Sequence, residues 1–473
     1  MATHTRCSLA DIPLPARCEP GGYRTWPLNL SRPQQPLVVF HLVKITRTRL
    51  LPILCIAAQL SLGNDILHAA ETADPAESAE TAVIKEAATE QARDREIDAS
   101  EDPSAKREVE IQKGTSRWLD EPNDINLYGS ARFRYRETDN DSGWSDGGSR
   151  AGVSMRYQAI PRYWLTFRYE AGFNLFTRVS DLLDPGASSG EGDNSDIFTR
   201  LLYVGLETPL LVATLGKNWS TYYKVAAFTD RFEGTGGSAS GTYNAGTDGG
   251  PSGTGRADNV LQSRFYIDYF PDGWGIKPFN LNVQLQNNEP IPNSDYNYGT
   301  TAGFSAIIDT QNDFTVGIAL NLADVPDDEL DELVSSGIDD DAVALLVGSR
   351  WLGQRWYTGV TVSRLLNHET TDENIYFDGS GVELYSQYQV NGPWWLIAGL
   401  NALVPDKGET QAGEYKVEYG IIGARYSIDG FTKMLYFNAR LDNGRLADGT
   451  ALGNTYTIGI RWDLGKKFNW RHY

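Results

Sequence analysis

The sequence is poor in the residues that build metal and thiol sites. Its 473 residues include five histidines, three cysteines and three methionines, and the cysteines are Cys7, Cys18 and Cys55. So few of these side chains leave little material for a metal or thiol centre, and we expect neither a metal nor a cofactor. The formal net charge of −20 argues against nucleic acid as a partner, because nucleic-acid-binding proteins carry basic surfaces.

Long hydrophobic runs are also missing. Residues 50–62 (LLPILCIAAQLSL) are almost wholly apolar, but a helix that crosses a bilayer needs about 20 such residues. Basic residues precede this run and small residues follow it, which predicts a secretory signal peptide over 44–70, Sec export and cleavage near Ala70. A buried helix is the alternative. Residues 1–43 precede the signal, and we expect them to lie upstream of the true start of translation.

The next segment is acidic and contains no aromatic residue as far as residue 117. Such a composition cannot bury enough apolar surface to fold alone, so it predicts a disordered or loosely helical spacer over 71–123. A short coiled coil is the alternative, because alanine, glutamate and basic residues dominate residues 80–97.

From residue 124 onward the pattern changes to an alternation with period two. In residues 125–136 (INLYGSARFRYR), Leu127 and Phe133 fall on one face while Arg132 and Arg134 fall on the other. This alternation predicts a β-strand with one apolar and one polar face. An aromatic content of 11% and 47 glycines fit an all-β chain.

Similar segments recur to residue 464. The sixteen predicted strands are 125–136, 150–159, 162–172, 196–207, 210–218, 259–270, 278–287, 297–308, 313–321, 342–352, 355–365, 375–390, 394–403, 415–427, 431–440 and 454–464. Short turns alternate with long polar loops, which is typical of bacterial outer-membrane barrels and has no counterpart in a β-sandwich, the alternative fold. We therefore predict a 16-stranded antiparallel transmembrane β-barrel over 124–464, followed by a C-terminal tail over 465–473.

One long connection contains a predicted helix. Residues 326–336 (PDDELDELVSS) begin with proline and precede Gly337, as helices often do. We expect this helix to lie on an outer loop. The acids of the same loop lack the spacing of a calcium-binding loop, so we interpret them as a solvated surface.

The third long loop, residues 219–258, is rich in glycine, serine and threonine. Loops of that length are uncommon in compact domains unless they are functional or disordered. This loop carries two acids, Asp230 and Glu233. Four basic residues lie on, or just outside, the predicted strands around it: Arg132, Arg150, Lys217 and Arg256.

Three stretches resemble the general diffusion porins of enteric bacteria, a family of trimeric channels. They are residues 126–136 (NLYGSARFRYR), 215–237 (LGKNWSTYYKVAAFTDRFEGTGG) and 255–265 (GRADNVLQSRF). The resemblance implies a homotrimer in the Gram-negative outer membrane, in contact with lipid and lipopolysaccharide. It also implies an inward-folded third loop that narrows a water-filled pore for small hydrophilic solutes and ions.

The resemblance further implies a pore constriction. Asp230 and Glu233 match the acids of the family's third loop, although they stand one residue closer together than usual. The basic ladder opposite matches Arg150, Lys217 (where arginine is usual) and Arg256. We expect Arg132 to replace the lysine that the family often has at the position of Ser130. The spacer and the residues after 464 have no counterpart in the enteric members.

These observations predict passive diffusion through a charged constriction, where opposed acids and bases set up a transverse field. The many acids of the outer loops favour cations, while the basic ladder favours anions, and on balance we expect a cation preference. A substrate-selective channel, for example for oligosaccharides that stack on Trp219, Tyr222 or Tyr223, is the alternative. An enzyme is not expected, because the mature chain keeps only His368, which we expect in an outer loop, and His472, and it shows no recognisable serine nucleophile.

Overall fold

The computed structural model describes residues 123–139, 141–175, 197–267, 279–310, 312–429 and 432–470. The predicted N-terminal extension, the signal peptide and all of the spacer before Asn123 lie outside the described residues. Within these ranges no helix is both long and apolar enough to cross a membrane.

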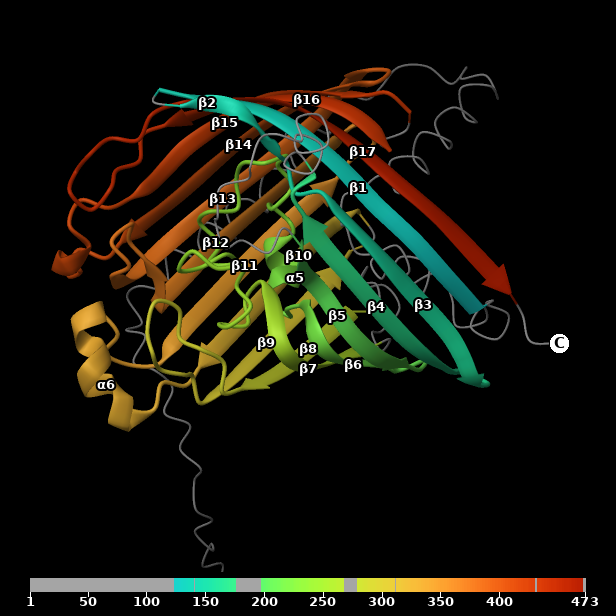
Figure 1. Ribbon diagram of the computed structural model, residues 1–473, viewed down its shortest axis with the longest axis horizontal. Coiled ribbons are helices and arrows are strands. Elements are labelled where there is room, and N and C mark those ends of the chain that lie inside the picture. The colour runs from blue at the N-terminus through green and yellow to red at the C-terminus, as the bar shows by residue number, and fades with distance from the viewer. Residues whose placement is uncertain are drawn as a thin grey trace, which may run out of the picture. The chain divides into compact units, whose positions relative to one another are not determined.

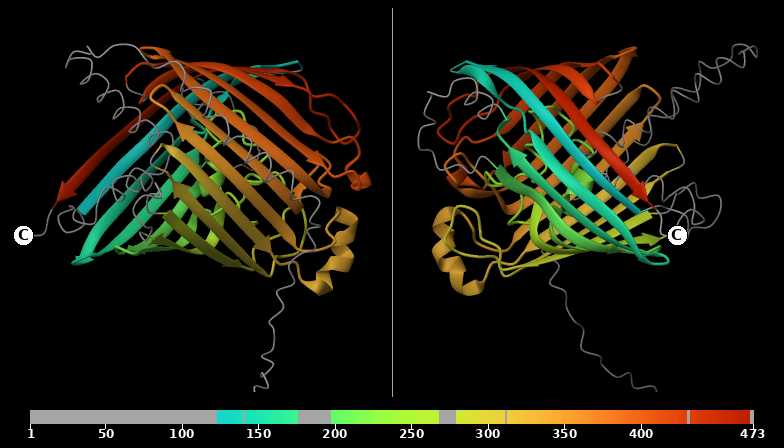
Figure 2. Two further views of the ribbon diagram at one scale, coloured as in Figure 1. Left: turned by 180° about the vertical axis from the view of Figure 1, so that it is seen from behind. Right: turned by 45° about the vertical axis from the view of Figure 1, so that its right-hand side comes forward.

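The described residues form one closed antiparallel sheet whose strands run obliquely around a ring (Figures 1 and 2). Its strands are β1 (Asn123–Thr138), β2 (Ser142–Asp146), β3 (Arg150–Ile160), β4 (Tyr163–Phe173), β5 (Ile197–Glu207), β6 (Leu211–Trp219), β7 (Arg256–Ile267), β8 (Phe279–Asn287), β9 (Thr300–Asp309), β10 (Phe314–Ala323), β11 (Ala342–Leu352), β12 (Trp356–Thr370), β13 (Tyr376–Asn391), β14 (Trp394–Pro405), β15 (Val417–Ser427), β16 (Lys433–Asp442) and β17 (Thr455–Trp470). β2 and β3 both pair with β1, every later strand pairs with its neighbours along the chain, and β1 pairs with β17 to close the ring. The predicted antiparallel barrel is therefore confirmed.

Two of these strands share one place in the wall, so the seventeen strands make a 16-stranded barrel. β2 pairs with residues 133–137 of β1, and β3 pairs with residues 124–130 of β1 along the same edge of that strand. The prediction of a loop over 137–149 was therefore wrong for most of its length. Residues 142–146 continue the ladder, and the break at 147–149 is a bulge with two glycines in it.

Alternation along each strand separates a polar interior from an apolar exterior. In β8 the buried side chains are Asn280, Asn282, Gln284 and Gln286. Between them, Val283 is 37% exposed and Leu285 52% exposed. This is the reverse of a water-soluble protein, and it fits a barrel whose outer face meets lipid and whose interior is polar.

The two ends of the barrel differ. Turns of two or three residues, such as 208–210 and 392–393, join strands at one end, while connections such as 220–255 and 324–341 extend at the other. The longer connection 324–341 carries α6 (Asp327–Leu333) and the 3₁₀-helix η4 (Val334–Ser336), followed by Gly337 at φ +87°. The predicted helix over 326–336 is confirmed.

Exposed aromatic side chains gather beside the short turns. They are the first or near-terminal residues of their strands: Tyr163, Phe314, Trp351, Trp356 and Trp394. Aromatic side chains at this level are typical of the boundary between lipid and water, where one edge of the ring is wet and the rest apolar.

The last strand is longer than predicted. β17 continues to Trp470 and pairs with β1 as far as Asn123, so residues 465–470 belong to the wall and not to a tail. Two consecutive lysines hide the alternation here. Lys467 lies 3.5 Å from Asp124 by Nζ–Oδ2, while the Lys466 ammonium lies 5.1 Å from the ring centre of Phe468, as a snorkelling side chain does.

Candidate functional site

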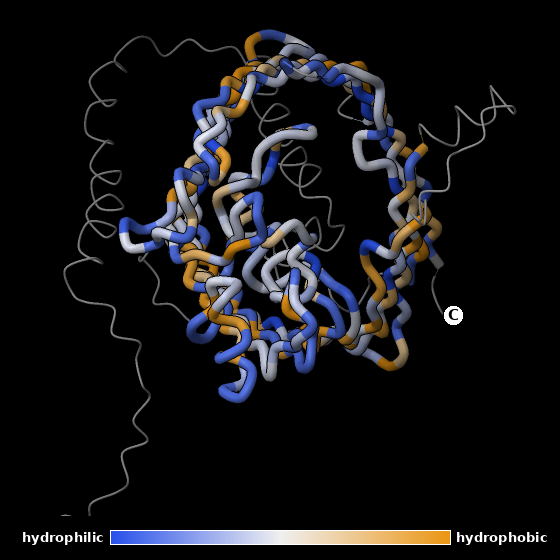
Figure 3. Tube along the Cα trace, turned by 60° about the vertical axis from the view of Figure 1, so that its left-hand side comes forward, coloured by the Kyte–Doolittle hydropathy of each residue, from blue (hydrophilic) through white to orange (hydrophobic). Residues whose placement is uncertain are grey.

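The connection between β6 and β7, residues 220–255, contacts side chains on the inner faces of strands opposite. It includes the short helix α5 (Tyr223–Ala226), which Figure 1 shows between the walls of the barrel. Figure 3 looks into the ring and shows chain crossing its interior. Glu383 of β13 accepts three hydrogen bonds from this connection, from Thr229 Oγ1 (2.6 Å), Ala239 N (2.8 Å) and Ser240 N (3.0 Å).

Two further hydroxyls fix the backbone of the same connection. Tyr357 Oη donates to Phe228 O at 2.7 Å, and Ser363 Oγ donates to Ala239 O at 2.7 Å. Because β12 supplies both donors and β13 supplies Glu383, these adjacent strands form a docking face for the connection. Buried backbone groups need such partners, since an unpaired one costs free energy comparable to a lost hydrogen bond.

Two glycines of the docking face leave the space that the connection occupies. A Cβ added to Gly359 would collide with Phe228 O, and one added to Gly381 would collide with Ala239 O. Both positions face inward on β12 and β13, so the absence of a side chain lets the connection lie directly against the wall.

Apolar packing completes the anchoring. Tyr222, Val225 and Phe228 are buried and join a cluster that includes Ala319 of β10 and Leu346 of β11. Full burial of side chains of this size contributes about 1.5–3 kcal/mol each. The connection is thus held by both polar and apolar contacts.

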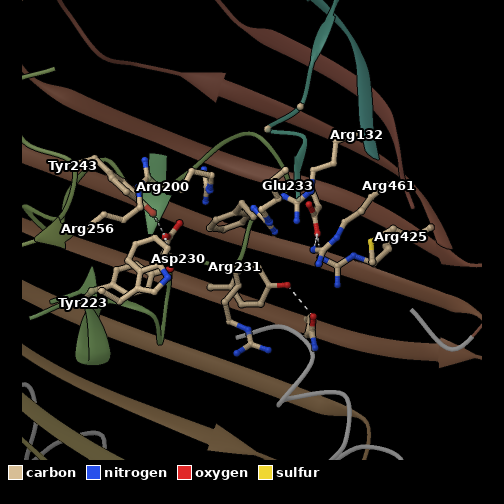
Figure 4. A pocket seen from close by; sticks show the side chains of 18 residues that line it. Arg132, Arg200, Tyr223, Asp230, Arg231, Glu233, Tyr243, Arg256, Arg425 and Arg461 are labelled. Atoms are coloured by element: carbon tan, nitrogen blue, oxygen red, sulfur yellow. Dashed lines mark hydrogen bonds and ion pairs between the residues drawn. The ribbon is translucent and has the colours of Figure 1, made fainter. Parts of the chain in front are cut away.

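A cavity of about 230 Å³ lies beside this connection (Figure 4). Five of the six residues predicted for the site line it: Arg132, Arg150, Asp230, Glu233 and Arg256. Four further arginines also line it: Arg200, Arg231, Arg425 and Arg461.

The two acids are held in different ways. Glu233 Oε1 lies 3.2 Å from Arg461 Nη1 and 3.5 Å from Arg425 Nη2, so it forms ion pairs with the wall. Asp230 Oδ2 accepts hydrogen bonds from Tyr223 Oη (3.0 Å) and Tyr243 Oη (2.8 Å), both in its own connection. Each carboxylate is therefore oriented by several donors.

Arg132 reaches the cavity at the bulge between β2 and β3. Its backbone bonds with the bulge instead of a regular ladder partner, through Gly147 N to Arg132 O (3.0 Å) and Arg132 N to Ser149 Oγ (3.0 Å). Its Nε donates to Ser130 Oγ at 2.8 Å. Bulges of this kind re-aim side chains next to functional sites.

Lys217 does not line the cavity. It pairs with Asp258 (2.6 Å) and Asp248 (3.1 Å), and Asp248 in turn pairs with Arg256 (3.1 Å). The register of β6 against β7 shifts between Gly216 and Asn218, and this bulge turns Lys217 away from its expected place in the ladder. It supports Arg256 through a shared acid.

Asp248 stays ionised in this cluster. Its partial burial opposes ionisation, but the neighbouring charges of Arg256 and Lys217 outweigh burial and hold its pKa below the ordinary value.

Sequence reasoning missed four arginines for a geometric reason. Arg200, Arg425 and Arg461 lie on strands far apart in the sequence, and only the stagger of the barrel brings them to one level. The sequence does show that each of these arginines occupies an inward-facing position in the alternation of its strand, β5, β15 or β17. Arg231 directly follows Asp230, and its guanidinium carbon lies 4.0 Å from the ring centre of Tyr357.

The candidate sugar-stacking residues serve mostly to pack the connection. Tyr222 is fully buried and donates to Ser240 O at 2.5 Å. Trp219 and Tyr223 line the cavity, but they stack on one another with ring centres 3.9 Å apart.

The predicted outer-loop histidine lies inside the barrel wall. His368 belongs to β12, is buried, and its Nε2 lies 2.8 Å from Gly241 O. The predicted loop placement was wrong because β12 runs five residues further than expected, to Thr370. His472 lies outside the described residues, and the described part of the chain contains no cluster of acids, histidines or cysteines suited to a metal ion.

Comparison with solved structures identifies the architecture. The OmpF protein of Salmonella typhi, solved in complex with daunomycin, superimposes with a TM-score of 0.58 at 19% identity, over 72% of this chain and 98% of that chain. The chain has the porin fold. An anion-selective porin from Comamonas acidovorans (TM-score 0.51, 15% identity, 72% and 99% covered) and the outer membrane channel DcaP of Acinetobacter baumannii (TM-score 0.51, 14% identity, 72% and 98% covered) are also similar.

Neither a protein-family model nor a curated protein sequence matches the chain. The structural similarity nevertheless covers nearly the whole of each similar porin, which is consistent with a complete barrel over β1 to β17.

Proposed function

We propose that this porin-fold chain forms a water-filled channel in the outer membrane of a Gram-negative bacterium, through which small hydrophilic solutes and ions diffuse passively. The observation that carries the proposal is the closed 16-stranded barrel with amides inside and exposed aliphatic side chains outside. Barrels of this strand number leave an aqueous channel, whereas small barrels fill their interior with side chains.

The proposal includes a constriction made by residues 220–255, folded inward as the third loop. The anchoring of this connection to Glu383 and to the glycines of β12 and β13 supports it. In the narrowed region, Asp230 and Glu233 lie with the arginines of the wall around one small cavity. Opposed charges in a narrow, low-dielectric space create a field that favours polar solutes over apolar ones.

The membrane setting also belongs to the proposal. The exposed apolar belt and the aromatic side chains beside the short turns support contact with lipid and lipopolysaccharide. Export by a signal peptide over 44–70 and assembly as a homotrimer rest on the sequence and its resemblance to trimeric porins. Chemical cross-linking in isolated outer membranes should give a band of three chains, and a purely monomeric pattern would contradict the trimer.

A saccharide-selective channel is the second candidate, because Trp219 and Tyr223 line the cavity. Their mutual stacking covers one face of each ring, so they form no open aromatic track and general diffusion is favoured. We propose no catalytic reaction for the chain.

Swelling of liposomes that contain the purified protein distinguishes the candidates. For general diffusion, the swelling rate should fall steadily with the size of the added sugar and rise linearly with its concentration. Saturation at low concentration by one class of saccharide would establish selectivity instead. Liposomes that remain impermeable to the smallest sugars would contradict the channel itself.

A further inference from the structure

We propose that the arginine-lined cavity is a binding site for small oxyanions, carboxylates or phosphates, and that it makes the channel prefer anions. This inference rests on the proposed channel function and names the solute class that the channel favours.

The charge of the cavity lining is strongly positive. Seven arginines and two acids line it. Acids outside the lining also pair with its arginines, among them Glu170 with Arg200, Asp248 with Arg256, and Asp463 with Arg461. Seven guanidiniums still exceed these five carboxylates, and two of the five are shared with the further bases Arg168 and Lys217.

The arginines form a continuous arc on the wall. Six of them come from β15, β17, β1, β3, β5 and β7, strands that follow one another around the barrel with only β16, β4 and β6 between them. The seventh, Arg231, comes from the connection that faces them (Figure 4). A solute that enters the cavity therefore meets guanidiniums from both sides.

Two of these arginines form a like-charged cross-strand pair, an arrangement that destabilises a β-sheet. Arg132 and Arg461 are direct cross-strand partners in the β1–β17 ladder. Glu233 and Asp463 relieve part of this repulsion, through ion pairs with Arg461 at 3.2 Å and 2.7 Å. A bound anion would relieve more, and departures from local stability rules concentrate at functional sites.

Further arginines extend the positive surface toward the long loops. Arg134 and Arg136 follow Arg132 at alternate positions of β1, and each places a guanidinium nitrogen 3.4 Å from Gly234 O. Guanidinium groups present paired donors that match the two oxygens of a carboxylate or a phosphate. This surface connects the outer mouth with the cavity.

The acids of the outer loops favour cations at the mouth, as their number in the sequence suggests. Selectivity, however, depends most on the narrowest region, where charges lie closest to the solute and water screens them least. The arginine arc lies there, so it reverses the preference that the overall charge of −20 implies.

The test is the reversal potential of the expressed full chain, purified from membranes and inserted in a planar bilayer under a KCl gradient. We expect chloride to be favoured over potassium by about fivefold or more, the order of magnitude given by a small excess of charge at about 8 Å. Succinate and inorganic phosphate should each reduce the chloride current reversibly, whereas an equal concentration of sucrose should not.

Variants give a second, independent readout. Arg132→Gln and Arg231→Gln should each lower the chloride preference about twofold, the effect of removing one partly screened charge. The matched control is Arg264→Gln, which removes an inward-facing arginine of β7 that does not line the cavity. Its preference should equal that of the parent protein.

The outcomes separate the two proposals. Normal conductance with equal or cation-favouring permeability, or without block by succinate and phosphate, would overturn the oxyanion site and leave the channel standing. Absence of any conductance would overturn the channel itself. Equal effects of Arg264→Gln and the lining variants would overturn the assignment to the cavity.

Discussion

Replacement of Glu383 by alanine should release the connection 220–255 from the barrel wall. Glu383 is 1% exposed and accepts hydrogen bonds from Thr229, Ala239 and Ser240 at 2.6–3.0 Å. Glu383→Ala removes the shared acceptor of all three donors at once. It leaves the strand itself intact, because the backbone pairing of β13 with β12 and β14 does not involve the side chain.

The size of the effect follows from these contacts. A buried donor left without its acceptor costs about 1–3 kcal/mol. The amides of Ala239 and Ser240 lose their acceptor, whereas the Thr229 hydroxyl can still donate to Ala226 O at 3.2 Å. Two unsatisfied donors therefore destabilise the docked connection by about 2 kcal/mol or more. Each 1.4 kcal/mol is a factor of ten in an equilibrium constant, so the ratio of docked to undocked connection should fall by about thirtyfold or more.

Single-channel recording measures this directly. We expect Glu383→Ala channels to show larger and noisier current steps than the parent, and to admit larger sugars in swelling assays. Glu418→Ala is the matched control, because Glu418 is also a glutamate on a strand but pairs with Lys416 at 2.7 Å, away from the connection. Parent-like conductance, noise and size limit in Glu383→Ala would refute the claim that the connection narrows the pore.

Three further predictions concern the close approach of the connection to Gly381, the outer face of the barrel wall, and the ion pairs of Asp248. Gly381→Ala should displace the connection and change the conductance, at a cost of about 1–3 kcal/mol for overpacking, whereas Gly420→Ala has room for its methyl group and should not. Leu202→Arg should destabilise the barrel by about 2–4 kcal/mol in urea-dependent folding into lipid vesicles, because Leu202 is 45% exposed on the outer face. Burial raises the pKa of the Asp248 carboxyl, but its basic neighbours lower it by more. Ionised Asp248 should therefore stabilise the docked connection at pH values above about 3.9, the pKa of an unfolded aspartate. This stabilisation should be lost as the pH falls through the lower pKa of the folded protein. Current noise should therefore rise in strong acid, and less so in Asp248→Asn, which is already weakened at neutral pH.

Each of these predictions can fail clearly. Equal conductance changes in the two glycine variants would remove the argument from close approach. A Leu202→Arg protein that folds into vesicles as readily as the parent would contradict the lipid-facing assignment. Identical acid dependence of noise in Asp248→Asn and the parent would show that the ion cluster does not hold the connection.

The wall of the barrel was largely predictable from sequence, because the alternation of apolar and polar residues is visible within the sequence of each strand. Leu127 and Phe133 against Arg132 and Arg134 already separate the two faces of β1. The extension of β17 was missed because Lys466 and Lys467 stand side by side. One of them snorkels on the outer face while the other pairs with Asp124 inside, and this distinction requires the three-dimensional register.

The site was predictable only in part, because it depends on non-local geometry. Asp230, Glu233 and Arg256 could be found from short stretches that resemble known porins. Arg425 and Arg461 could not, because no nearby residue marks that the stagger brings them to Glu233. Lys217 was misplaced because a bulge, which sequence patterns do not reveal, changes the direction of its side chain.

The most direct test of the central claim is the conductance of the purified protein in a planar bilayer. The account predicts stable, ohmic steps that pass both ions of KCl and favour chloride. The current steps should keep their size when sugars are added at concentrations too low to change the viscosity of the solution, since transport requires no saccharide site. Bilayers that stay silent after verified insertion of the folded barrel would contradict the account.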